Sequence, residues 1–121
     1  MLARQVEVRC YGRSRQHGAT LSVISRSLAE ELGIKVVRRD QVETGAGMII
    51  VDRGVAVIAI GDRETISEVW VSDIISRVLV GSVTLELLGL RVDPRTGKLE
   101  PAPLLLYTTL QQQPVKARVS A

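Results

Sequence analysis

The stretch VAVIAIGDRETISEVWV, at 55–71, constrains the fold more than any other part of the sequence. Small and β-branched apolar residues fill the first run, and apolar and polar residues alternate in the second; both are typical of strands. Gly61 and Asp62 separate the runs and form a turn dipeptide. The sequence therefore predicts a β-hairpin here and a fold in which strands dominate.

The composition fits such a fold. The chain has 121 residues, within the usual size of one domain, so we expect one folding unit. Aromatic residues make up 2% of the chain and Phe is absent, so the core must be built from Val, Ile, Leu and Ala.

Periodicity and turn residues predict the remaining elements. Leu28, Ala29 and Leu32 lie on one helical face after Ser27 and Glu30, which have the spacing of a capping box. Leu21 and Val23 share one side of the second predicted strand. The predicted strands lie at 6–11, 20–24, 34–39, 55–60, 63–71, 78–80 and 102–110, with hairpins at 40–54 and 91–101 and helices at 25–33 and 82–88.

Eight to ten short strands, two short helices and hairpin-length connections predict the all-β class, as a small closed or sandwiched barrel. We place the domain at 1–108. Residues 109–121 include QQQPVKARVSA, have little to bury, and are predicted to form a flexible C-terminal tail. Trp70 is expected to fill part of a core that is otherwise poor in aromatic residues.

The net charge of +3 permits a nucleic-acid partner only if the basic residues converge on one face. No aromatic platform is interleaved with them, so a solvated surface is the favoured interpretation. Cys10 is alone, and neither a signal peptide nor a membrane-spanning apolar run is present, which predicts a cytoplasmic protein. The lack of Asn and the scarcity of Met suit a thermophile.

Three segments carry a resemblance to a known family: HGATLSVISRSLAEELGI, VLVGSVTLELLGLRVDP and TGKLEPAPLLLY. Together they resemble the single-domain, retroviral-type (retropepsin-like) aspartic proteases, in particular the small archaeal and bacterial members. The resemblance covers residues 6–108. It implies a closed β-barrel with one half-site per chain, a homodimer about a two-fold axis, and no cofactor or metal.

The resemblance places the catalytic motif of that family at residues 16–20. Gly18, Ala19 and Thr20 match its Gly-Ala-Ser/Thr, and His17 stands where Thr or Ser is expected. Gln16 stands where the catalytic Asp belongs, and the polar residues 12–17 replace the apolar strand that leads to it.

Aspartic proteases activate water with two carboxylates that share a proton. Gln16 cannot exchange a proton near neutral pH, and no second His or Cys joins His17 in a metal or nucleophile site. The sequence thus predicts a protein without peptidase activity and without catalytic residues.

The resemblance also places a flap, the hairpin that covers the peptide in these proteases. The flap-like residues are Glu43, Thr44, Gly45, Ala46, Gly47 and Met48. ETGAG at 43–47 imitates the catalytic tripeptide, but too few residues separate Gly45 from Gly81 for it to be the motif. A cleft under two flaps would take an extended peptide by strand addition.

Two alternatives remain. One is an active aspartic peptidase, paired with an Asp-bearing paralogue or completed by a segment missing from this chain. The other is a basic β-barrel that binds nucleic acid weakly and with strong salt dependence. The arginines that would carry this binding are Arg4, Arg9, Arg13, Arg15, Arg38 and Arg39.

Overall fold

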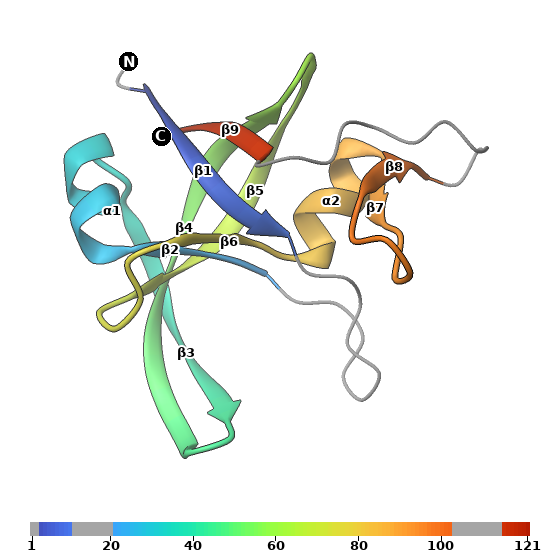
Figure 1. Cartoon of the computed structure of the whole chain (residues 1–121). Coiled ribbons are helices and arrows are strands. Elements are labelled where there is room, and N and C mark those ends of the chain that lie inside the picture. The colour runs from blue at the N-terminus through green and yellow to red at the C-terminus, as the bar shows by residue number, and fades with distance from the viewer. Residues whose placement is uncertain (1–2, 11–20, 103–114) are drawn as a thin grey trace.

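The computed structural model describes residues 3–10, 21–102 and 115–121 (Figure 1). The strands are β1 (Ala3–Cys10), β2 (Ser22–Ser25), β3 (Val36–Thr44), β4 (Gly47–Ile60), β5 (Arg63–Ser72), β6 (Val78–Val80), β7 (Leu90–Val92), β8 (Leu99–Pro101) and β9 (Val115–Ser120). The helices are α1 (Arg26–Leu32) and α2 (Ser82–Leu88). The prediction of a mainly β protein with two short helices is confirmed.

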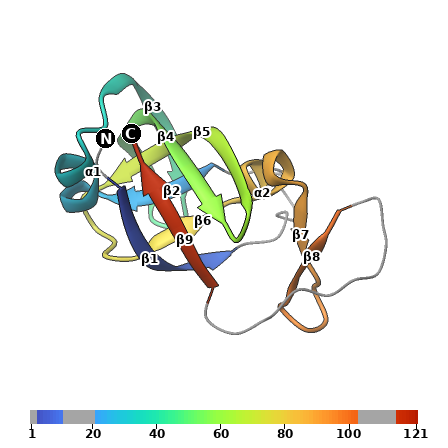
Figure 2. The ribbon, with the colours of Figure 1, turned by 90° about the horizontal axis from the view of Figure 1, so that it is seen from above.

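Seven strands share one sheet in the order β3-β4-β5-β2-β6-β1-β9, and β9 also pairs with β4. The long strand β4 makes this possible, because its first part pairs with β3 and residues 57–60 pair with β9. Hydrogen-bonded neighbours therefore run in a ring through β4, β5, β2, β6, β1 and β9, which Figure 2 shows around a common interior. Strands β7 and β8 form a separate two-stranded sheet beside α2.

Aliphatic side chains from most strands of this ring fill the interior. Ile24, Ile58, Val69, Val80 and Val119 are completely buried, and they come from β2, β4, β5, β6 and β9. Burying a Val or Ile side chain stabilises a fold by about 1.5–3 kcal/mol. The core predicted from Val, Ile, Leu and Ala is thus confirmed for the described residues.

Gly54 marks the point at which β4 leaves β3. A Cβ atom on Gly54 would lie 2.8 Å from the carbonyl oxygen of Lys35 and 2.8 Å from Cγ2 of Ile34. The register between β3 and β4 also shifts here, between Val36 and Arg38. The close approach requires glycine, because any other side chain would push the two segments apart.

Both helices end as predicted, at a glycine in the left-handed region. Gly33 (φ 73°) follows α1 and Gly89 (φ 74°) follows α2. The capping box predicted from Ser27 and Glu30 is wrong, because the Ser25 hydroxyl caps α1 and accepts a hydrogen bond from the Leu28 N–H at 3.2 Å.

The predicted flexible tail is wrong for residues 115–120. These residues form β9, which pairs with β1 and β4 and buries Ala117 and Val119. Val115, Ala117 and Val119 alternate with polar residues, so the strand period was present in the sequence. The strand predicted at 102–110 lies outside the described residues except for Ala102.

Leu21, directly before β2, and Val23 share one side, as predicted, and both are half-buried, whereas Ser22 and Ile24 are fully buried. The Ser22 hydroxyl has hydrogen-bond partners in the interior. The predicted place of Trp70 differs from the structure. Trp70 does not fill the core. It lies between the buried Val69 and Val71 on the opposite face of β5. No described helix has the length and apolar character needed to cross a membrane.

Candidate functional site

The predicted catalytic motif, Gln16, His17, Gly18, Ala19 and Thr20, lies outside the described residues. The structure does place the two strands that flank it, because β1 and β2 both pair with β6. Cys10, at the end of β1, is opposite Val80, and the Ser22 hydroxyl at the start of β2 accepts a hydrogen bond from the Gly81 N–H at 3.0 Å. Cys10 and Ser22, described residues on either side of the motif, therefore both lie near the junction of β6 and α2.

A buried cluster of hydroxyl groups holds this junction together. Thr84, on α2, lies with its hydroxyl 2.5 Å from that of Ser22 and 2.8 Å from that of Ser67 on β5. All three side chains are buried, and no buried side-chain polar atom of the described residues lacks a hydrogen-bond partner. Because satisfied hydroxyls cost little to bury, the cluster fixes α2 against β2 and β5.

The flap-like residues form the tip of the hairpin of β3 and β4. Thr44 pairs with Gly47 and Glu43 pairs with Met48, with Gly45 and Ala46 in the turn. Gly47 has a φ of 114°, which favours glycine at this position. The predicted hairpin is confirmed, and its role as a flap remains a prediction. Figure 1 shows that the hairpin projects away from the rest of the sheet.

One face of the hairpin base carries an ion-pair cluster around Asp40. The carboxylate accepts hydrogen bonds from Arg53 Nε at 2.5 Å and from the Trp70 indole Nε1 at 2.8 Å, and Arg38 lies 3.3 Å away. The indole hydrogen bond, followed by the bond and charge of Arg53, lowers the pKa of Asp40. Asp40 therefore stays ionised, and its carboxylate has a structural role as the acceptor of the hydrogen bonds from Arg53 and Trp70.

The other face carries a second cluster around Arg26, the first residue of α1. Its guanidinium contacts Asp52 on β4 at 2.8 Å and Asp73, just after β5, at 2.9 Å. The hydrogen bonds that Arg26 donates to Asp73 and Asp52 raise the pKa of Arg26, and the bond that Asp73 accepts lowers the pKa of that carboxyl. Arg39 adds a contact to Asp52 at 3.3 Å. The cluster ties the hairpin base to the segment between β5 and β6.

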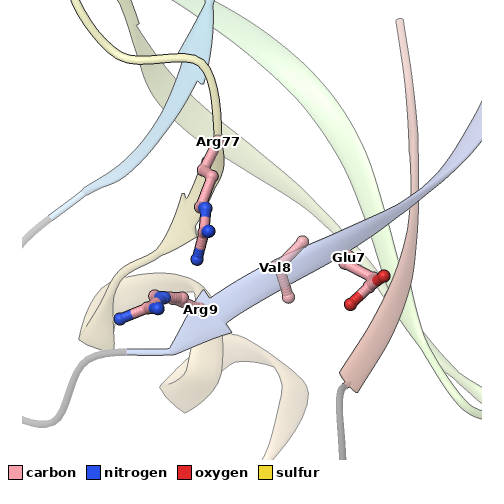
Figure 3. Close-up of a pocket in the computed structure, with 4 residues that line it drawn as sticks. All are labelled: Glu7, Val8, Arg9 and Arg77. Carbon is pink, nitrogen blue, oxygen red and sulfur yellow. The ribbon is translucent and has the colours of Figure 1, made fainter.

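That segment leads to a pocket that no pattern in the sequence indicates. Glu7, Val8 and Arg9 of β1 and Arg77, directly before β6, line a cavity of about 390 Å³ (Figure 3). A smaller hollow of about 220 Å³ shares Glu7 and Arg77 and continues towards the start of α1. The alternation in VEVRC places Arg9 on the outer face, but only the parallel pairing of β1 with β6 brings Arg77 beside it.

No three His, Cys, Asp or Glu residues come together as a metal site within the described ranges. Cys10 packs against the core, and burial raises the pKa of its thiol to about 11. Family models, curated proteins and solved structures were compared with the chain, and none of them matches it.

Proposed function

We propose that the chain is a retropepsin-like domain that forms a homodimer, binds extended peptides and does not hydrolyse them. The observation that carries the proposal is the projecting hairpin of β3 and β4. Its tip falls on the six flap-like residues, and its side chains Met48 and Ile50 are 60% and 67% exposed. Exposed apolar side chains at a glycine-rich tip are suited to covering a ligand.

The described topology is compatible with the barrel that the resemblance implies. The ring of strand pairings is the pattern expected of a small closed barrel. The VLV strand β6 lies between β1 and β2 and runs through Gly81 into α2. This arrangement supports a half-site at the junction of β6 and α2, which a second copy would complete across a two-fold axis.

The tip of the hairpin has room for a peptide main chain. A Cβ atom on Gly45 or on Gly47 would meet nothing within 4 Å, so there is space beside these residues for an approaching strand. Main-chain hydrogen bonds give affinity in strand addition, and neighbouring side chains give specificity. Met48 would contact alternate side chains of the bound peptide.

The proposed lack of hydrolysis rests on the sequence at the motif and on the state of the described carboxylates. Gln16 brings no carboxylate to the position of the catalytic Asp. Asp40, Asp52 and Asp73 are each held by arginine, and the hairpin and the loop after β5 depend on them. In the alternative of an active peptidase, the acid pair would come from an Asp-bearing paralogue or from a segment missing from this chain.

The activity test uses the full chain with denatured casein and a peptide library from acidic to neutral pH. We expect no cleavage, whereas reproducible cleavage that pepstatin inhibits would overturn the proposal. Sedimentation equilibrium should report a dimer, and a monomer at micromolar concentration would contradict the two-fold cleft.

The binding test compares two exposed apolar residues by fluorescence anisotropy with labelled library peptides. Met48→Gln at the tip should weaken binding by severalfold, because it removes apolar contact area. Ile66→Gln is the matched control, since Ile66 is 69% exposed on β5, away from the tip. Equal affinities for the two variants would remove the hairpin from the proposed cleft.

A further inference from the structure

Two arginines in the described part of the chain differ from the rest. Every other described arginine contacts a carboxylate or, for Arg63, the backbone carbonyls of Leu88 and Gly89. Among these residues Arg9 and Arg77 have no such partner, and both line the same pocket. Two neighbouring guanidinium groups without a counter-ion form a region of positive potential.

The strands hold these two side chains on one face. Val8 pairs with Val78 in the parallel ladder of β1 and β6, and both valines are buried. Arg9 follows the buried Val8 on β1 and therefore points outward. Arg77, directly before β6, is exposed as well. In Figure 3 the guanidinium of Arg77 extends toward Arg9, while the carboxylate of Glu7 points away from both, toward β9.

From this geometry we propose that Arg9 and Arg77 bind the carboxylate of an Asp or Glu side chain in a peptide ligand. The carboxylate as ligand follows from the pocket, and the peptide as its carrier rests on the proposed function. Guanidinium groups bind carboxylates through paired, charge-assisted hydrogen bonds. The pocket of about 390 Å³ has space for one such side chain.

The surroundings favour an acidic residue within a peptide over a phosphate polymer. The adjoining hollow is lined by both polar and apolar side chains, including Ser76, Val6 and Leu28, which suits the residues that flank an acidic side chain. Glu31 lines the adjoining hollow and would repel a run of phosphates that continued along it. No aromatic side chain among the described lining residues is available to stack on a base.

The arginine pocket is connected to the flap-like hairpin through Arg26. This residue holds Asp73, at the start of the segment that carries Arg77, and also Asp52, at the base of the hairpin. A peptide that binds in the pocket and under the hairpin would therefore contact two regions that the ion pairs of Arg26 hold together. The carboxylate would then fix the register of the peptide relative to the hairpin tip.

The test measures the affinity of the full chain for two labelled peptides, acetyl-Ala-Val-Glu-Val-Ala-amide and the same peptide with Gln in place of Glu. We expect the Glu peptide to bind about fivefold more tightly, the upper range for an exposed ion pair. Arg9→Gln and Arg77→Gln should each reduce this preference. Arg95→Gln is the matched control because Arg95 is 87% exposed in the distant β7–β8 hairpin, and it should leave the preference unchanged.

The outcomes separate this inference from the proposed function. Equal binding of the Glu and Gln peptides would overturn the arginine site and leave peptide binding intact. If neither peptide binds, the proposed function fails, and the site is tested by NMR of the arginine side-chain N–H groups during titration with N-acetylglutamate amide. Saturable shifts at Arg9 and Arg77 would support a carboxylate site, and their absence would overturn it.

A competition arm tests the choice of ligand. Inorganic phosphate and a single-stranded oligonucleotide are each added against the labelled Glu peptide. Weak competition by both, which disappears as salt is raised, is the expected result. If the oligonucleotide binds more tightly than the Glu peptide and Arg77→Gln abolishes this binding, the site takes phosphate polymers and the peptide assignment is overturned.

Discussion

The two halves of strand β4 belong to one continuous strand but lie in opposite environments. Beyond Gly54, the strand runs between β5 and β9, and Ile58 is completely buried. Before Gly54, the strand runs beside β3 into the projecting hairpin, where Ile50 is largely exposed. The same residue type therefore has two roles within one strand.

This difference shows which forces hold each half. The inner half is stabilised by apolar burial, which contributes about 25 cal/mol for each Å² removed from water. The outer half depends on cross-strand hydrogen bonds and on the arginine contacts of Asp40 and Asp52, which lie close to the surface. Surface ion pairs contribute up to about 1 kcal/mol each, so we expect the outer half to be the less stable one.

The largest expected effect is on the inner half. Ile58→Ala should lower the free energy of unfolding by about 2–5 kcal/mol, because it leaves a cavity in the core. Ile50→Ala is the matched change in the outer half and should cost no more than about 0.5 kcal/mol. Urea denaturation measures both. Similar losses for the two variants would mean that the hairpin is packed against another surface.

A smaller effect is expected at the boundary between the halves. Gly54→Ala would place a Cβ atom 2.8 Å from the Lys35 carbonyl oxygen, and the resulting shift should cost about 1–3 kcal/mol. The control is Gly45→Ala in the turn, where a Cβ atom has open space. Thermal unfolding of both variants provides the comparison. A neutral Gly54→Ala variant would refute the close crossing of β4 and the segment before β3.

The smallest effect is expected from pH, and it should be confined to the outer half. The Trp70 indole, followed by Arg53, lowers the pKa of Asp40, so the folded state favours the ionised carboxylate. This stabilisation is complete above the unfolded pKa of about 4 and is lost as the pH falls through the lower folded value. Amide hydrogen exchange of the hairpin between pH 7 and 3 should show this loss.

The variant Asp40→Asn should reduce the pH dependence of hairpin exchange, since no carboxylate remains to be protonated. Trp70→Phe keeps an aromatic ring but removes the indole donor, and should move the acid transition to higher pH. If Asp40→Asn exchanges with the wild-type pH dependence, other carboxylates hold the hairpin and the cluster around Asp40 does not.

Local chemistry made most elements of the fold predictable. Glycine at helix ends and turns, and the strand periods around them, identified both helices and the main hairpins, including the tip at Gly45. Long-range partners were not predictable in the same way. Ser22 is buried because Thr84 and Gly81 satisfy its hydroxyl, and Trp70 faces outward because its indole reaches Asp40.

In the candidate site, too, local patterns were predictable and long-range partners were not. The hairpin that carries the flap-like residues was predictable because a short apolar run between glycines is a local pattern. The pocket was missed because Arg9 and Arg77 meet only through the parallel pairing of β1 and β6, which no local pattern specifies. The sequence alone could identify Arg9 as an outward-facing basic residue. It could not show that Arg77 lies beside it, or that neither arginine contacts a carboxylate among the described residues.

The double pairing of β9 has a consequence for how the protein is made. During translation β1 and β4 are synthesised before β9, which is the last of the nine described strands. In the folded protein β9 pairs with an edge of β1 and with an edge of β4. Until then both edges present free backbone groups, a known route to association between nascent chains. Slow translation of the residues before β9 should therefore lower the yield of native protein, without altering any contact in the finished molecule.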